Sequence, residues 1–275
     1  MTKLAVISDI HGNIIALRAA LAEIEREGAD KILVLGDLFE AGHVQDIMDE
    51  LRGCGALVIR GNGEGYHLSN RAGKYGDEWA QYDQFAALRE IYGLITPDIF
   101  RWIEALPCQI SLRYENVSLL MVHGSPKADN ENLIASRPAA LRRALRISDE
   151  TIILCGHSHR AMLKRYGKRY ICNAGSVGDN FDPHFTADVT FISIERKDIS
   201  FNQRRVPYDF EAWRQLAGDL PYARLSLRGT QLGRGLSGEG LWVEFLSEAK
   251  RRGGWPVPNE IWNGLFAEWE KKGLV

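Results

Sequence analysis

The first sixty residues alternate between short apolar segments and longer amphipathic segments, and this alternation restricts the possible folds more than any other feature of the sequence. Apolar runs of strand length lie at Lys3–Ser8, Lys31–Leu35 and Ala56–Ile59. Between them, residues 13–27 and 44–51 carry apolar side chains at helical spacing, and a glycine follows each closely. This β-α-β-α-β order predicts right-handed crossovers and parallel strands in one sheet.

The remainder of the chain divides into three regions of different character. Residues 64 to about 107 contain aromatic residues at helical spacing, which predicts helices inserted after the third strand. Strands then resume, and the last ones follow one another so closely that we expect hairpins. From about residue 207 the spacing is helical again. The strands predicted here are Ser118–Val122, Thr151–Leu154, Tyr170–Cys172, Val189–Ile194 and Ile199–Arg205.

Residue types that bind metal ions follow each predicted core strand. In open α/β sheets, ligands bind beyond the carboxyl ends of the strands. One Asp-x-His or His-x-His pair is weak evidence, but five such motifs at strand ends point to a metal site. Because alternate side chains of an extended segment point the same way, we expect Asp9 and His11 to reach one ion together. The five segments are SDIHGN at 8–13, GD at 36–37, RGNGE at 60–64, VHG at 122–124 and CGHSH at 155–159.

This run of motifs resembles the calcineurin-like metallophosphoesterase superfamily over roughly residues 3–205. The opening SDIHGN, the length and the helical insert are most similar to its bacterial and archaeal phosphodiesterases, and some relatives with this opening cleave diadenosine tetraphosphate. The resemblance implies an α/β fold, a four-layer αββα sandwich of two mixed β-sheets flanked by helices. We expect this domain over residues 1–206, with the helical insert at about 64–107 and a C-terminal helical appendage over 207–275.

The resemblance also implies a centre for two divalent metal ions. Four imidazoles, two carboxylates and one amide oxygen suit Mn, Fe, Zn, Co or Ni better than Mg or Ca, and we favour Mn. The implied reaction is attack on phosphorus by a hydroxide that bridges the two ions. Asp37, Asn62 and His123 would be catalytic by holding this hydroxide and placing the phosphate. The implied ligands are Asp9, His11 and His159 for one ion, Asn62, His123 and His157 for the other, and Asp37 between them.

One position departs from the family pattern. Much of the superfamily has a histidine after the Gly-Asn pair, whereas this chain has Gly63 followed by Glu64. In those relatives the histidine helps to place the phosphate or protonates the leaving group. Without such a proton donor, a leaving group of low pKa has an advantage because it needs no proton. We therefore predict hydrolysis of a phosphodiester or a dinucleoside polyphosphate. Glu64 is a candidate substitute for the acid, but a solvated loop carboxylate is the simpler interpretation.

Two other classes of function fit the same motifs. One is a phosphomonoesterase, for example a protein phosphatase. The other is a non-catalytic scaffold, since a vesicle-coat subunit has this fold with a degraded site; the complete set of ligand types here favours an enzyme. The net charge of −2 argues against a nucleic-acid partner, so we expect a small phosphorylated or nucleotide substrate. The sequence does not predict the oligomeric state.

The sequence predicts a cytoplasmic protein without a membrane partner. No apolar run is long enough to cross a bilayer, and charge appears too early in the chain for a signal peptide. The four cysteines are widely spaced and have no CxxC pair, so we expect buried free thiols.

Several residues near the motifs have structural interpretations. We expect His43, His67 and His184 at loop or surface positions, with His67 the least certain because it follows Asn62 closely. The segment 173–176 is expected to be a turn beside the site. The aromatic residues between 79 and 102 are expected to pack in the core, and a nucleobase platform is the alternative.

Overall fold

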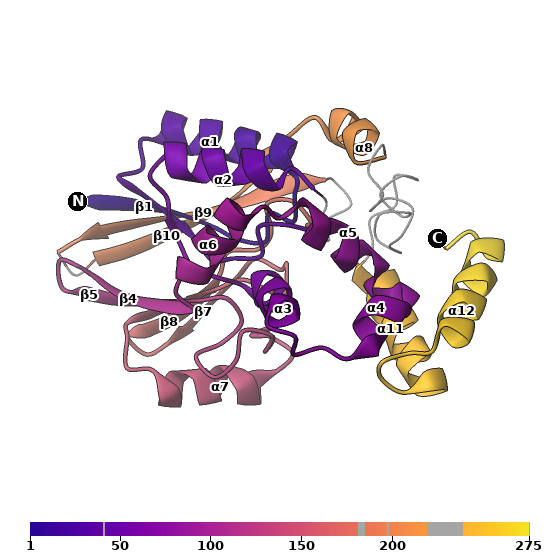
Figure 1. Ribbon diagram of the computed structural model, residues 1–275. Helices are drawn as coiled ribbons and strands as arrows, with labels where there is room; N and C mark the ends of the chain where they lie inside the picture. Colours follow the sequence, from indigo (N-terminus) through magenta and orange to yellow (C-terminus); the bar gives the residue numbers. More distant parts are fainter. Residues whose placement is uncertain (41, 181–184, 197, 219–238, 275) are drawn as a thin grey trace.

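The computed structural model describes residues 1–40, 42–180, 185–196, 198–218 and 239–274, which form two five-stranded sheets packed between layers of helices (Figure 1). In the first sheet, β1 pairs in parallel with β2, which pairs in parallel with β3, whereas β9 is antiparallel to both β1 and β10. The parallel strands and the final hairpin were both predicted. The strands of this first sheet, in spatial order, are β10 (Asp198–Pro207), β9 (Thr186–Glu195), β1 (Thr2–Ile7), β2 (Lys31–Val34) and β3 (Leu57–Val58).

The second sheet is also mixed, and two of its strands were not predicted. Strands β5, β6 and β8 are parallel, while β4 and β7 pair antiparallel at the two edges. These edge strands expose much of their surface, so they lack the apolar run that identifies a buried strand. The strands are β4 (Gln109–Tyr114), β5 (Val117–Val122), β6 (Ile152–Cys155), β8 (Arg169–Asn173) and β7 (Met162–Tyr166).

Strand β1 is buried on both faces, which explains its continuous apolar run. Leu4 and Val6 pack in the cluster between the two sheets, whereas Ala5 and Ile7 pack against the helices. The outer helices are α1 (Ile14–Glu27) and α2 (Val44–Gly53) on the first sheet and α7 (Pro138–Ile147) on the second. The result is the predicted αββα order of layers.

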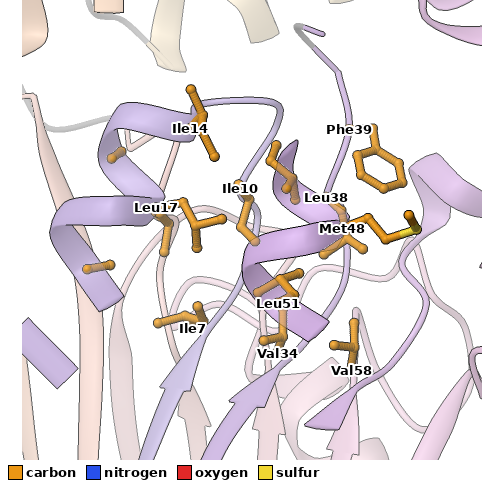
Figure 2. Packing of buried hydrophobic residues seen from close by; sticks show 14 of the residues in the cluster. Ile7, Ile10, Ile14, Leu17, Val34, Leu38, Phe39, Met48, Leu51 and Val58 are labelled. Carbon is orange, nitrogen blue, oxygen red and sulfur yellow. The ribbon is translucent and has the colours of Figure 1, made fainter. Parts of the chain in front are cut away.

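Figure 2 shows where the outer helices pack on the first sheet, at the carboxyl ends of its strands. In Figure 2, Leu17 of α1 and Leu51 of α2 lie close to Ile7 and Val34, whereas Met48 of α2 extends toward the side of Phe39; all these side chains are buried. Helix α1 begins where the Asn13 side chain accepts a hydrogen bond from the backbone of Ala16, and it ends at Gly28 with φ 65°. These contacts fix the strand ends, and therefore the loops that follow them.

The insert after β3 is helical, as expected. Its last helix packs Ile99, Phe100 and Ile103 into the core of the first sheet. Within the described residues, no helix has both the length and the apolar character needed to cross a bilayer. The elements of the insert are α3 (Asn62–Arg71), α4 (Asp77–Gln81), the 3₁₀ turn η1 (Asp83–Phe85), α5 (Ala86–Leu94) and α6 (Pro97–Ala105).

Helices α8 (Phe210–Gly218), α11 (Glu239–Gly253) and α12 (Asn259–Lys271) follow the last strand. Figure 1 shows α11 and α12 beside α4, at the end of the molecule opposite the N-terminus. The backbone N–H of Asp83 donates to Asn259 Oδ1 at 2.7 Å, and that of Val257 donates to Gln84 Oε1 at 3.2 Å. Helices α11 and α12 are thus attached to the insert, whereas α8 packs against α1.

All four cysteines are free thiols, but the expectation that they are buried is only half right. Cys155 and Cys172 lie in the central strands of the second sheet and are buried. Cys54 and Cys108 are exposed, because they follow a helix end and precede an edge strand.

Candidate metal centre

The predicted ligands lie on loops at the carboxyl ends of β1, β2, β5 and β6 and at the start of α3. Backbone hydrogen bonds hold these loops side by side. The N–H of His11 donates to the Asp37 carbonyl at 3.1 Å, and the N–H of Gly156 donates to the His123 carbonyl at 2.7 Å. The N–H of Gly178 donates to the Asp9 carbonyl at 3.0 Å, which joins the loops of the two sheets.

The expectation of extended ligand segments is wrong. The φ angles of Asp9 and His11 are 54° and 48°, and those of His157 and His159 are 62° and 55°. Asp37 has φ 53°. The chain therefore turns sharply at the ligands themselves, in a left-handed conformation that costs non-glycine residues about 1–2 kcal/mol each. The side chains converge because of these turns, and not because of strand alternation.

Three of the predicted residues form one group of possible ligands. The Nε2 atoms of His11 and His159 lie 2.9 Å apart. Asp9 Oδ1 lies 3.6 Å from the first of these nitrogens and 3.3 Å from the second. Asp9 is fully buried, and its Oδ1 accepts no hydrogen bond from the described residues. A buried carboxylate oxygen between two imidazoles is well suited to a cation.

The other four predicted residues lie next to this group. Asp37, His123 and His157 form a second set of mutually close ligand atoms. Asn62 Oδ1 is 3.1 Å and Asp37 Oδ2 is 3.2 Å from His123 Nε2. The same nitrogen is 3.9 Å from Asp9 Oδ1, which connects the two groups. The structure thus brings all seven predicted residues together, with His157 and His159 in different groups.

Hydrogen bonds at the outer ring nitrogens determine which atoms face the centre. His123 Nδ1 lies 2.7 Å from the Leu35 carbonyl, and His159 Nδ1 lies 2.8 Å from the Asp179 carbonyl. A carbonyl only accepts, so each Nδ1 carries a proton and each Nε2 is the nitrogen that can bind a metal ion. His11 Nδ1 lies 2.6 Å from a carboxylate oxygen of Glu40. This is the usual arrangement of a metal-binding histidine with an outer acceptor, so the residues present fit divalent cations.

The electrostatics of the centre also favour positive charge. Burial disfavours a charged His11, but Glu40 and Asp9 outweigh it and raise the pKa to about 10. Burial likewise opposes charge on His123, yet Asp37 and Asp9 raise its pKa to about 9. The pKa of Asp9 lies well below its ordinary value because the histidines outweigh its burial. In the metal-free centre, protons on the histidines supply the positive charge. A bound metal ion can supply this charge in their place.

Glu64 is not a solvated loop carboxylate, which corrects the expectation from the sequence. It is fully buried, and it accepts hydrogen bonds from three backbone N–H groups: Asp37 at 3.1 Å, Leu38 at 2.8 Å and Gly61 at 2.9 Å. Burial and the nearby Asp37 raise its pKa. Glu64 therefore ties the loop after β2 to the loop after β3. Its place at the third position of α3, typical of a capping box, is a signal from which the contact with Gly61 was predictable.

The two glycines around Asn62 allow these loops to approach closely. A Cβ atom at Gly61 would lie 2.2 Å from Asp37 Oδ1, so no larger residue fits without moving that carboxylate. The N–H of Gly63 donates to the same oxygen at 2.7 Å. Gly63, which stands where much of the family has a histidine, thus holds Asp37 with its backbone.

The outcomes for the other histidines differ. His67 was expected at a loop or surface position, but it is fully buried on α3, and neither ring nitrogen has a hydrogen-bond partner in the described part of the chain. Burial lowers its pKa to about 4. His43 is half-buried just before α2, and its Nδ1 lies 3.3 Å from Asp46. His184 lies outside the described residues.

Residues 173–176 form a turn that holds the ligand loops, in agreement with the structural interpretation. The Asn173 side chain donates to the Gly156 carbonyl at 2.7 Å, and the Ser176 hydroxyl donates to the Asp9 carbonyl at 2.7 Å. Both side chains are fully buried.

Comparison with known proteins gives one family and several similar folds. A family model described as the calcineurin-like phosphoesterase superfamily domain matches residues 2–197. The chain is 27% identical over 229 residues to the uncharacterized protein MJ0912 of Methanocaldococcus jannaschii, covering 76% of this chain and 88% of that protein.

Two solved structures have a similar fold. A metallophosphoesterase from Sphaerobacter thermophilus has a TM-score of 0.65 and 22% identity, over 86% of this chain and 99% of that one. The hypothetical protein PH1004 from Pyrococcus horikoshii OT3 has a TM-score of 0.68 and 18% identity, over 84% and 98%.

Proposed function

The chain belongs to the calcineurin-like phosphoesterase superfamily, and on that premise we propose that it hydrolyses phosphodiesters or phosphoanhydrides at a centre for two divalent cations. It is a metal-dependent hydrolase of phosphoric esters, as its family is. The number of ions, their identity and the substrate class are our proposal. The observation that carries it is the pair of adjacent ligand groups, linked by Asp9 Oδ1 at 3.9 Å from His123 Nε2.

Each group of side chains has a role in this proposal. Asp9, His11 and His159 would hold one ion, and His123, His157 and Asn62 the other, with Asp37 shared between them. When bound, the two ions would neutralise the phosphate oxygens and lower the pKa of a water molecule. The mixture of nitrogen and oxygen donors favours Mn over Mg or Ca.

The residues around the centre position these groups. Asn62 lies in the first turn of α3, whose N-terminus favours an anion such as the substrate phosphate. The buried Glu64 and the N–H of Gly63 hold Asp37, so this carboxylate keeps its orientation when substrate binds.

The residues near Asn62 also bear on the substrate class. Glu64 is engaged by three backbone donors and is a poor candidate for a proton donor. Burial raises the pKa of Tyr66, the next titratable side chain on α3, to about 12, so its hydroxyl is a weak acid and a poor proton donor near neutral pH. Without an acid at this position, the leaving group must depart as an anion. Phosphodiesters with acidic leaving groups, and phosphoanhydrides, meet this requirement better than alkyl monoesters.

The test combines metal removal with a comparison of substrates. The chelated protein should not hydrolyse methyl p-nitrophenyl phosphate, and Mn²⁺ should restore turnover with two ions bound per chain by elemental analysis. Asp37→Asn should reduce kcat/KM by more than about tenfold, whereas Glu90→Gln, at an exposed position on α5, should leave it unchanged. Turnover that survives chelation, a single bound ion or faster hydrolysis of p-nitrophenyl phosphate would each contradict the proposal.

A further inference from the structure

The metal centre opens into a cavity of about 540 Å³. His11, Asp37 and Asn62 line one end of the cavity. The rest of its wall comes from the insert and from the C-terminal helices, including Trp79 and Trp262. The volume is typical of pockets that enclose a small organic ligand. A phosphate at the metal centre would therefore have its organic substituent inside this cavity.

A stack of aromatic rings forms one wall. The rings of Tyr75 and Trp79 are nearly parallel, with centroids 5.0 Å apart and an angle of 6°. Phe85 continues the stack at 5.6 Å and 23° from Trp79, and Trp255 meets Phe85 edge-on at 6.0 Å. All four residues line the cavity, and two of them, Trp79 and Phe85, belong to the aromatic residues that were expected to pack in the core. Such a wall favours flat π systems in its ligand.

The side-chain amide of Gln84 in the wall has one atom without a hydrogen-bond partner among the described residues. Gln84 Oε1 accepts the hydrogen bond from Val257, which fixes the orientation of the side-chain amide. The Gln84 Nε2 atom is then a buried donor without an acceptor among the described residues. Buried donors are normally satisfied, and a ligand acceptor would become the partner of this one after a rotation that turns the amide into the cavity. Glu40 and Glu78 also line the cavity and offer acceptors.

The charges of the wall limit how many phosphates the substrate has. Among the described residues that line the cavity, none is Lys or Arg. The further phosphates of a polyphosphate chain would therefore face Glu40 and Glu78 without a cationic side chain from this wall. One phosphate at the metal centre avoids this cost.

We propose that this cavity binds the base of a nucleoside phosphodiester with one phosphate, with the base against the aromatic wall and an acceptor of the base on Gln84. This inference rests on the proposed phosphodiesterase function. It selects a substrate class within that function, because flat rings, an amide donor and carboxylate acceptors match the face and the edge of a heterocyclic base.

The far wall of the cavity lies outside the family match, which covers residues 2–197. Leu246, Trp255 and Trp262 belong to the C-terminal helices and the loop between them. Hydrogen bonds to Asp83 and Gln84 place this segment against the insert. The matched domain thus carries the metal ligands, while the specificity for the base depends partly on the segment that follows it.

The experiment compares two diesters with the same leaving group on the Mn-loaded full chain. Thymidine 5′-(p-nitrophenyl phosphate) should have a kcat/KM about tenfold or more above that of methyl p-nitrophenyl phosphate, the lower range for one base–aromatic stack. Trp255→Ala changes an exposed ring and Gln84→Leu removes the donor, and each should reduce this ratio. Leu163→Ala, on the edge strand β7 and outside the cavity lining, should leave it unchanged.

A binding measurement separates this inference from the proposed function. Titration calorimetry of the metal-free chain with adenosine should show binding that Trp255→Ala and Gln84→Leu weaken. If both diesters are hydrolysed with equal kcat/KM, or the variants leave ratio and binding unchanged, the base site is refuted while the phosphodiesterase stands. A higher kcat/KM for diadenosine tetraphosphate than for the nucleoside diester would refute the single-phosphate substrate. If neither the diesters nor diadenosine tetraphosphate is hydrolysed, the proposed function fails, and the inferred nucleoside diester substrate fails with it whatever adenosine binding shows.

Discussion

The sharpest prediction concerns the buried carboxylate of Glu64, which joins two loops that carry predicted metal ligands. Its Oε2 accepts from the N–H groups of Asp37 and Gly61, and its Oε1 accepts from Leu38. Glu64→Gln keeps the shape of the side chain but replaces one of these oxygens by an NH₂ group. In either orientation of the amide, that group faces at least one backbone N–H.

The magnitude follows from the hydrogen bonds that are lost. In the better orientation the amide oxygen faces Asp37 and Gly61, and one donor, Leu38 N–H, stays unsatisfied. A buried donor without a partner costs about 2 kcal/mol. Glu64→Ala would remove all three acceptors at a cost of roughly 3 to 6 kcal/mol. That loss is comparable with the whole stability of a typical domain, so the glutamine variant is the informative one.

The assay is urea unfolding of the metal-free protein, followed by titration with Mn²⁺. We expect the free energy of unfolding of Glu64→Gln to fall by about 2 kcal/mol, and its metal affinity to fall by about tenfold because the loop that carries Asp37 loses its hydrogen bond at Leu38. The matched control is Glu90→Gln, the same change at an exposed helical position, which should stay within about 0.5 kcal/mol of the native protein.

The reasoning is refuted if Glu64→Gln unfolds at the same urea concentration as the control and binds Mn²⁺ as tightly. Lower stability with unchanged affinity would show that Glu64 supports the fold without positioning Asp37.

Three further changes have distinct expected results. Glu40→Gln removes the charge beside His11 Nδ1, and calorimetric titration should show Mn²⁺ binding about 10- to 100-fold weaker. Gly61→Ala places a Cβ atom 2.2 Å from Asp37 Oδ1, and elemental analysis should show metal lost from the folded protein. His67 has a pKa of about 4 in the fold, against an ordinary value of 6.5, so the unfolded chain binds its proton first as the pH falls. Stability should therefore decrease from pH 6.5 to pH 4 by up to about 3 kcal/mol, and urea unfolding should show a weaker pH dependence in His67→Leu.

These expectations have matched controls. Gly53→Ala adds the same methyl group at the end of α2, where no atom lies within 4 Å, and it should bind metal like the native protein. Three results would contradict the reasoning. They are native Mn²⁺ affinity in Glu40→Gln, full metal content in Gly61→Ala, and an unchanged pH dependence of the stability in His67→Leu.

The layers of the fold and the grouping of the metal ligands were predictable, because both depend on position along the strands. An apolar run such as Leu4–Ile7, buried on both faces, identifies a central strand whatever its neighbours are. His123 follows a strand of the second sheet, so its place beside Asp9 was implied by the family resemblance. Asp9 and Asp37 follow neighbouring strands of the first sheet, whose ends meet at one edge, so these two were expected together. This expectation requires only the order of the elements.

Features that depend on contacts between distant segments were not predictable in the same way. The burial of Glu64 depends on the approach of two loops, and the burial of His67 depends on how α3 packs. Exposed edge strands such as β7 lack the apolar signal. Gln84 and Trp255 line one cavity although they are far apart in the chain, and the hydrophobic periodicity of the sequence does not predict that they meet.

Five predicted metal ligands have a left-handed backbone that lowers the stability of the fold while their side chains serve the activity. They are Asp9, His11, Asp37, His157 and His159. Glycine or asparagine would adopt these angles with less strain, so such substitutions would relieve part of the conformational cost while they remove a ligand. A laboratory selection for heat resistance alone would therefore be expected to erode this centre first. Raising the thermal stability while keeping the activity requires changes elsewhere, in the helices that cover the sheets.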